Sequence, residues 1–158
     1  MEKAFPTLNL PAAPLHVKIG QAGRQVVFDP LRRRFVTLTA EEWVRQHFVH
    51  FLVAERGFPP SLMANEVGVN VSGVTRRCDS VLFARADASP RVIIEYKAPH
   101  IGITEAVFRQ VESYNSILHA DYLIVSNGLR HFCCYFDYNK GRAQFLPDIP
   151  HYHQLAPR

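Results

Sequence analysis

The sequence has few cysteines and lacks long apolar runs. Its 158 residues include three cysteines, Cys78, Cys133 and Cys134. The adjacent pair and the distant third cysteine match neither a disulfide framework nor the CxxC spacing of a metal site. No apolar run is long enough to cross a bilayer, and residues 1–14 lack the apolar centre of a signal peptide. These absences predict a cytoplasmic protein with buried thiols and no membrane contact.

Several functional motifs are also missing. There is no Gly-rich phosphate loop, no helicase motif and no internal repeat, and the eight histidines form no cluster with metal-ligand spacing. The length fits one domain with its own core, and 47% hydrophobic with 20% charged residues is ordinary for a globular protein. A net charge of +4 permits nucleic-acid binding without requiring it.

The most informative residues lie in two short strands joined by a turn. RRCDSVLF (76–83) alternates, which places Asp79, Val81 and Phe83 on one face and Cys78, Ser80 and Leu82 on the other. VIIEYKA (92–98) places Glu95 and Lys97 together on one face. Between the strands, ADASPR has the small polar residues and proline of a turn. Paired as a hairpin, the strands bring Asp79, Glu95 and Lys97 to one end of a sheet.

Two carboxylates and an ammonium among so many apolar residues are costly to desolvate unless they bind something. Two carboxylates can hold a divalent metal ion, and an adjacent lysine can position or activate a water molecule. The pattern therefore favours phosphodiester cleavage. The alternative is a globular domain whose acids pair with lysine for purely structural reasons.

Asp79 followed by Glu95-Tyr96-Lys97 resembles the PD-(D/E)XK nuclease motif, with Cys78 where the motif has proline. Five blocks together resemble the N-terminal nuclease domain of type I restriction enzyme R subunits, in particular its short stand-alone branch. The blocks are TAEEWVRQHF (39–48), RRCDSVLF (76–83), IIEYKAP (93–99), FRQVESYN (108–115) and YLIVSNG (122–128).

The resemblance implies an α/β (α+β) restriction-endonuclease-like fold. We expect a central mixed sheet of about five strands flanked by helices, with an N-terminal β-hairpin. Within the single domain, residues 1–38 are expected to form an extension and hairpin, 39–146 the nuclease-like core and 147–158 a tail. The expected helices begin at Thr39 and Thr104 and end near Glu55 and Leu118.

The first helix offers two acids in its first turn. Thr39 with Glu42 three residues later forms a capping-box pattern, which gives Glu42 a structural role. Helical spacing places Glu41 on the apolar face, which favours Glu41 as the acid that assists the site. The alternative is an exposed Glu41 stabilised by the helix dipole. Arg45 is expected to face solvent or a partner, and Glu66 is expected either near the metal or on the solvent side of its strand.

The second helix carries Gln110 in the middle of its apolar face, where an amide needs a partner. With Tyr114 it forms the QxxxY pattern that accompanies the nuclease motif in this resemblance. Gln110 is thus a candidate catalytic residue with Tyr114 in support, or else it satisfies a buried carbonyl. Candidate DNA-binding residues are Arg76, Arg77 and Arg109, although surface ion pairing would explain the first two equally well.

The resemblance implies a Mg²⁺-dependent endonuclease that hydrolyses DNA, with Mn²⁺ as a substitute. Asp79, Glu95 and the backbone carbonyl of Tyr96 would hold the metal, and Lys97 would orient or deprotonate the attacking water. Expected partners are DNA, restriction-system or other DNA-processing subunits, and a second copy of the chain. The alternative is a catalytically silent nuclease-like subunit that binds DNA or protein.

Overall fold

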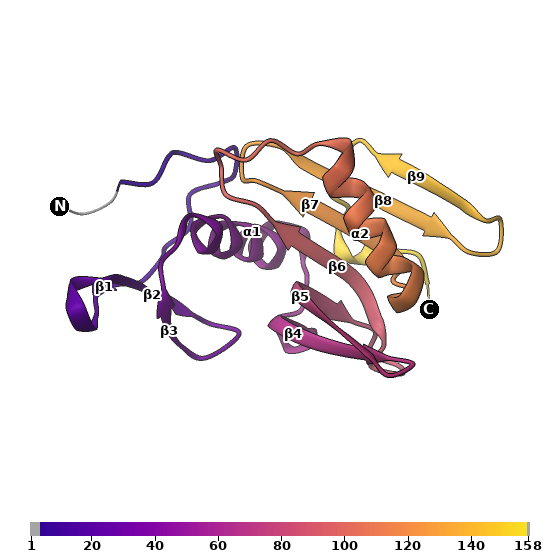
Figure 1. Cartoon of the computed structure of the whole chain (residues 1–158), viewed down its shortest axis with the longest axis horizontal. Coiled ribbons are helices and arrows are strands. Elements are labelled where there is room, and N and C mark those ends of the chain that lie inside the picture. The colour runs from indigo at the N-terminus through magenta and orange to yellow at the C-terminus, as the bar shows by residue number, and fades with distance from the viewer. Residues whose placement is uncertain (1–3, 158) are drawn as a thin grey trace.

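The strands of residues 4–157, the part of the chain that the computed structural model describes, form two sheets. The side chains of Val71, Gln110, Val111, Tyr114 and Ile117 lie outside this description. A mixed sheet has the order β4-β5-β6-β7-β8-β9, in which only β6 and β7 run parallel (Figure 1). Its strands are β4 (Met63–Val71), β5 (Val74–Phe83), β6 (Pro90–Tyr96), β7 (Tyr122–Ser126), β8 (His131–Asp137) and β9 (Arg142–Leu146).

The N-terminal sheet is antiparallel and contains β1 (Val17–Ile19), β2 (Gln25–Asp29) and β3 (Arg34–Thr37). The predicted hairpin is confirmed in β1 and β2, with the QAG segment between them as a short 3-10 helix. Strand β3 was not predicted from the sequence. It pairs with β2 from Val26↔Thr37 to Asp29↔Arg34 and leads directly into the first helix.

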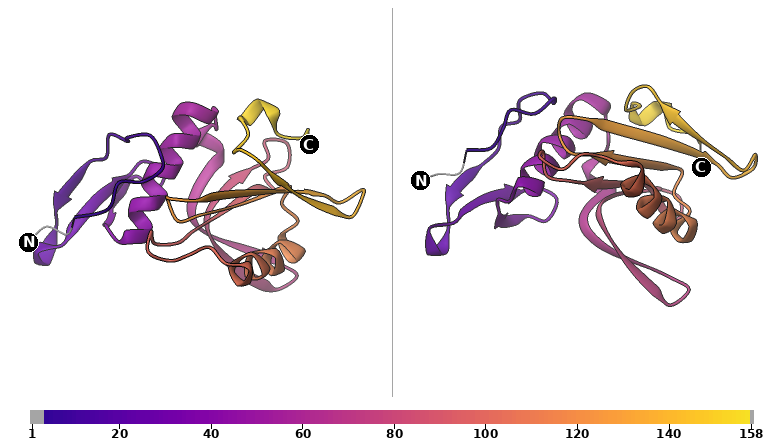
Figure 2. Two further views of the ribbon diagram at one scale, coloured as in Figure 1. Left: turned by 90° about the horizontal axis from the view of Figure 1, so that it is seen from above. Right: turned by 45° about the horizontal axis from the view of Figure 1, so that its top comes forward.

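Two helices cover opposite faces of the six-stranded sheet (Figure 2). Helix α1 (Ala40–Arg56) is capped by Thr39, whose Oγ1 accepts from the Glu42 amide, and ends at Gly57 in the left-handed conformation. Helix α2 (Glu105–Leu118) begins after Thr104 and ends before His119. Both predicted helices are therefore confirmed. Neither helix, nor any other in the described residues, is long and apolar enough to span a membrane.

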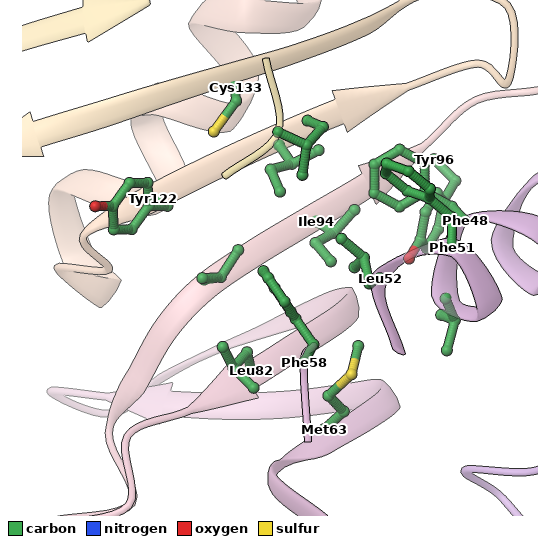
Figure 3. Close-up of a cluster of buried hydrophobic side chains, with 14 of the residues drawn as sticks. Phe48, Phe51, Leu52, Phe58, Met63, Leu82, Ile94, Tyr96, Tyr122 and Cys133 are labelled. Carbon is green, nitrogen blue, oxygen red and sulfur yellow. The ribbon is translucent and has the colours of Figure 1, made fainter. Parts of the chain in front are cut away.

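A buried cluster on the α1 side anchors the sheet to the rest of the fold. Phe48 and Leu52 of α1 are fully buried against Ile94 and Tyr96 of β6 (Figure 3). The C-terminal segment also joins this cluster through Leu155, so residues expected as a tail pack on the α1 face. Burying a large apolar side chain stabilises a fold by about 1.5–3 kcal/mol. This layer therefore fixes β6, the strand that carries Glu95.

The sheet opens into a fork between β5 and β6. Their pairing runs from Phe83↔Pro90 only as far as Ser80↔Ile94. Beyond Ser80, β5 continues with β4 alone, while β6 stays with β7. Asp79 is therefore the first residue of β5 beyond the fork, directly opposite Glu95.

At the fork the faces of β4 and β5 also exchange. Asn65 and Ser80 point to the α1 side, whereas Val67 and Cys78, two residues away on the same strands, pack on the α2 side. Simple alternation would keep residues two apart on one face. The exchange coincides with Glu66, whose φ of 56° lies in the left-handed region. The prediction that Cys78 and Ser80 share a face is therefore wrong.

Gly128 offers a test of how the N-terminal segment is held. It follows β7 with a φ of +84°, and an added Cβ would lie 2.7 Å from Leu8 Cδ2. We expect Gly128→Ala to lose about 1 kcal/mol from the left-handed backbone and roughly another 1 kcal/mol from displacing Leu8.

Gly141→Ala is the matched control, because Gly141 has a φ of +60° and open space around it. Urea denaturation of both variants measures the difference. Equal losses would show that the contact between Leu8 and Gly128 does not stabilise the fold.

Candidate active site

The fork brings the predicted carboxylates together. Asp79 Oδ2 accepts a hydrogen bond of 2.9 Å from the backbone amide of Tyr96, the residue after Glu95. Both acids are partly buried, and the pKa of Glu95 is raised to about 9. Burial is the main cause, followed by the negative charge of Asp79 and a side-chain hydrogen bond with it. Without a cation, burial and the neighbouring Asp79 therefore favour the protonated form of Glu95 at neutral pH.

Lys97 lies immediately after β6, and its backbone amide donates to the carbonyl of Ser126 at 2.9 Å. Its positive charge is near enough to Glu95 to offset part of the rise in that pKa. The structure thus places Asp79, Glu95 and Lys97 at one end of the sheet. Cys78 adds no nucleophile, because burial and the two nearby acids raise the pKa of its thiol to about 12.

The donor set fits a hard divalent cation. Glu95 Oε1 is buried and has no hydrogen-bond partner within the part of the chain that the structure describes. A cation between the two carboxylates would replace the proton on Glu95 and satisfy this oxygen. Mg²⁺ binds oxygen, commonly through one or two carboxylates with water completing its shell. Consistent with such a sparse set, the described residues contain no group of three or more His, Cys, Asp or Glu placed to hold a metal.

Arg45 is buried at 6% exposure, which makes its predicted place on the solvent side wrong. Its Nη1 donates to the backbone carbonyl of Asp79 at 2.8 Å, and its Nη2 donates to Glu66 Oε1 at 2.6 Å. Its Nε lies 2.9 Å from Glu42 Oε2. The Arg45 guanidinium thus connects helix α1 to the backbone of Asp79 and to Glu66, the residue with the left-handed φ on the neighbouring strand.

Glu66 accepts from two arginines. Besides Arg45, Arg77 Nε donates to Glu66 Oε2 at 2.6 Å. Burial alone would raise the pKa of Glu66, but these hydrogen bonds and positive charges outweigh it and leave the pKa lowered. The carboxylate of Glu66 is therefore engaged in structure, beside the candidate metal site.

Of the two acids at the start of α1, Glu42 has the structural role predicted for it, and Glu41 takes the exposed position given as the alternative. Glu42 is the buried one, at 5% exposure, and it pairs with Arg32 as well as with Arg45. Glu41 is exposed on the wall of a polar cleft of about 470 Å³ that Arg45 and Glu66 also line. The preference for Glu41 as the acid facing the site was thus wrong, because the pull of two arginines on Glu42 cannot be read from apolar spacing.

The remaining candidates are less closely placed. Gln110 and Tyr114 occur in α2, but their side chains lie outside the described residues. Arg109 is exposed and pairs with Glu105 at 3.1 Å. Arg76 and Arg77 point to opposite faces of β5, since they pair with Val69 and Gly68 respectively. Of the two, Arg77 is the one on the open side.

A second polar chain supports the site from the α1 side. Tyr96 Oη donates to Ser80 Oγ at 2.9 Å, Ser80 donates to Asn65 at 2.5 Å, and Asn65 donates to Asp29 at 2.9 Å. Asp29 and Ser80 are fully buried. Because buried polar groups are costly without partners, this chain fixes the N-terminal sheet against the fork. No local pattern in the sequence indicates it.

Arg45→Met should lower the free energy of unfolding by roughly 3 kcal/mol, because it removes one of the two arginines that pair with each of Glu42 and Glu66 and leaves the Asp79 carbonyl without its donor. Arg77→Met is the control, because Arg77 pairs with the same Glu66 but its own side chain is 73% exposed. This change should lower the free energy of unfolding by under about 1 kcal/mol. Chemical denaturation gives both values. Amide exchange should also quicken at Tyr96 more than at Ile124 in Arg45→Met, and uniform quickening would contradict a local role.

Comparison with known proteins supports the same reading of the fold. The family model described as type I restriction enzyme R protein N terminus matches residues 40–150. Among curated proteins, no relative matches this chain.

A fragment structure of a candidate HsdR subunit of a type I restriction enzyme from Vibrio vulnificus YJ016 is similar, with a TM-score of 0.53 and 22% identity. The match covers 75% of this chain and 24% of that one, so the chain spans about a quarter of that relative's length. At this identity the likeness bears on the fold alone. The family match covers most of the chain, and the chain therefore belongs to the family of type I restriction enzyme R protein N-terminal domains.

Proposed function

We propose that this nuclease-like domain is a Mg²⁺-dependent endonuclease that hydrolyses DNA phosphodiesters. The observation that carries the proposal is the pairing of Asp79 with Glu95 at the fork, where the pKa of Glu95 is raised to about 9 and its Oε1 has no partner among the described residues. Two adjacent carboxyl groups, one with a raised pKa and an unpaired buried oxygen, suit a divalent cation. Family membership supports the same chemistry.

Each residue has a distinct proposed role. Asp79 and Glu95 would hold the metal, with the Tyr96 carbonyl as a further oxygen ligand. When bound, Mg²⁺ supplies Lewis-acid activation of phosphate and water. The Tyr96 amide fixes one oxygen of Asp79, which orients the carboxylate before any ligand arrives. Lys97 Nζ would orient the attacking water, accept its proton or donate to the phosphate as charge develops.

A catalytically silent subunit is the alternative. It would use the same fold to bind DNA or another restriction-system subunit, and the carboxyl pair would simply share its proton. Cys78 in the place of the motif's proline and the absence of a third acid at the site, among the described residues, are compatible with this reading. Metal binding and cutting therefore have to be measured separately.

Metal binding should depend on pH in a defined direction. Mg²⁺ must displace the proton on Glu95, so its affinity should rise with pH up to about 9, by up to tenfold per pH unit. Calorimetry in two buffers of different ionisation enthalpy measures the released proton. Asp79→Asn and Glu95→Gln should abolish the binding, whereas Glu55→Gln, an exposed acid on α1, should not. Wild-type affinity in both site variants would contradict the metal assignment.

The same group should affect the stability of the metal-free protein. The pKa of Glu95 is raised from 4.5 to about 9 on folding, so the folded state binds more protons than the unfolded state between these values. Stability should therefore fall as pH rises through this window. Glu95→Gln should remove that part of the pH dependence in thermal melts. An unchanged slope would show that Glu95 titrates normally.

Lys97 allows a test of catalysis itself. Lys97→Ala and Lys97→Arg should both slow Mg²⁺-dependent nicking of plasmid DNA by at least about 10²-fold. Alanine removes the amine, and the guanidinium of arginine is too basic and too large to replace it. Metal binding and melting temperature should stay close to wild type. Lys140→Ala, in the β8–β9 turn, is the control. Full activity in Lys97→Ala would exclude the catalytic role.

The assay should include duplex, branched and single-stranded DNA, with and without the other restriction-system subunits. Mn²⁺ should substitute for Mg²⁺. If the wild-type chain binds metal but cuts none of these under any condition, the silent-subunit reading replaces the nuclease.

A further inference from the structure

Beyond the fork, residues 67–78 of β4 and β5 form a two-stranded ribbon that leaves the six-stranded sheet. Within it, pairs from Val67↔Cys78 to Val71↔Val74 are complete, and β5 has no pairing with β6 before Ser80. Ser72 and Gly73 close the tip with positive φ values. In the right-hand view of Figure 2 this hairpin, coloured magenta to rose, extends away from the layered core.

The ribbon has one covered face and one open face. Its inner face carries Val67, Val69 and Cys78, which join the apolar cluster on the α2 side. Its outer face carries two neighbouring cross-strand pairs, Gly68↔Arg77 and Asn70↔Thr75, whose members are all exposed. The exchange of faces at Glu66 is what turns these four residues outward.

The chemistry of the outer face suits nucleic acid. Residues 67–78 include no acidic residue, and of their two arginines Arg77 lies on the outer face. Arginine and asparagine are the side chains that hydrogen-bond guanine and adenine edges, and threonine can contact either base edges or thymine methyl groups. Asn70 Nδ2 and Thr75 Oγ1 are only 3.4 Å apart and can contact one base pair together.

Gly68 leaves a gap beside Arg77. Its φ is outside the left-handed region, and a Cβ there would meet only Thr75 Cγ2, at 3.5 Å. The fold therefore does not require glycine at this position. A missing side chain in the middle of a polar face permits close approach of another molecule.

Arg77 can change partners at small cost. It pairs with Glu66 at 2.6 Å, but its side chain is 73% exposed. Exposed ion pairs contribute about 0–1 kcal/mol, so a phosphate or base edge can compete for the guanidinium. Glu66 keeps its second arginine, Arg45, when this happens.

The ribbon is also at a useful distance from the site. Thr75 precedes Asp79 by four residues on the same strand, a span of about 13 Å at 3.3 Å per residue. That span corresponds to roughly four base-pair steps of 3.4 Å. A duplex contacted by the outer face would thus extend to the acids at the fork.

We propose that the outer face of the ribbon, Gly68, Asn70, Thr75 and Arg77, enters the major groove of duplex DNA and positions the phosphate that is cut. This inference rests on the proposed nuclease function and assigns its substrate contact. The major groove, about 12 Å wide, admits a two-stranded ribbon. Single-stranded DNA fits less well, because the outer face has no aromatic side chain on which a base could stack.

The test is fluorescence anisotropy of a labelled duplex with the full chain in Ca²⁺, which should support binding without cutting. Gly68→Leu should weaken duplex binding at least tenfold while leaving calorimetric metal affinity and melting temperature unchanged. Ala143→Leu, an exposed small-to-large change on β9, is the matched control and should bind as wild type. Arg77→Gln should weaken binding and lower the slope of log affinity against log salt by about one.

If Gly68→Leu does not fold, duplex affinity is measured instead in the double variant Asn70→Ala with Thr75→Ala, which removes only exposed atoms. Its control is Gln144→Ala on β9. Wild-type duplex affinity in the folded ribbon variants overturns the inference, as does a greater loss on single strands than on duplex. If wild type cuts DNA and these variants cut it as fast, the ribbon inference fails alone. If wild type binds neither metal nor duplex, the proposed function fails with it.

Discussion

The architecture of the site depends on how the backbone is satisfied where β5 leaves β6. A strand that departs from a sheet loses ladder partners, and buried backbone groups without partners are costly. At Asp79 the loss is made good by two side chains. Arg45 donates to the Asp79 carbonyl, and the carboxylate of Asp79 accepts from the Tyr96 amide. The second bond holds Asp79 against β6, beside Glu95. The hydrogen bond that satisfies the Tyr96 amide at the fork therefore also brings the two acids together.

The charges around the fork follow from the same requirement. Arg45 can be buried because Glu42 and Glu66 surround it, and those acids are in turn matched by Arg32 and Arg77. Burial raises the cost of any unpaired charge, so such a network stays nearly neutral. The arginines of this network therefore have Glu42, Glu66 and the Asp79 carbonyl as partners. Among the described residues, the cation that offsets the charge of Glu95 is Lys97, and the pKa of Glu95 remains raised to about 9. The arginine network therefore leaves the charge of Glu95 only partly offset.

Periodicity in the sequence was sufficient to predict the helices and the grouping of Asp79, Glu95 and Lys97. These features depend on local spacing and on one hairpin, and they are confirmed in the fold. Strand β3 was missed because RRRF reads as a charged loop, whereas in the fold Arg34–Thr37 pairs with β2. The inward turn of Glu42 and the burial of Arg45 were missed because their partners come from distant segments. Apolar spacing alone cannot locate a buried ion pair.

Glu66 shows why simple strand alternation fails beside the carboxylate pair. A non-glycine residue in the left-handed region within a strand costs of order 1–3 kcal/mol and persists only where its surroundings hold it there. Here two arginines hold its carboxylate, and the resulting exchange of faces turns Val67 and Val69 inward and Asn70 outward. Without that exchange, strict alternation would place the valines on the open face and the polar pairs against α2. The left-handed conformation of Glu66 thus accounts both for the apolar inner face of the ribbon and for its polar outer face. A regular hairpin of the same composition could not provide both next to the carboxylate pair.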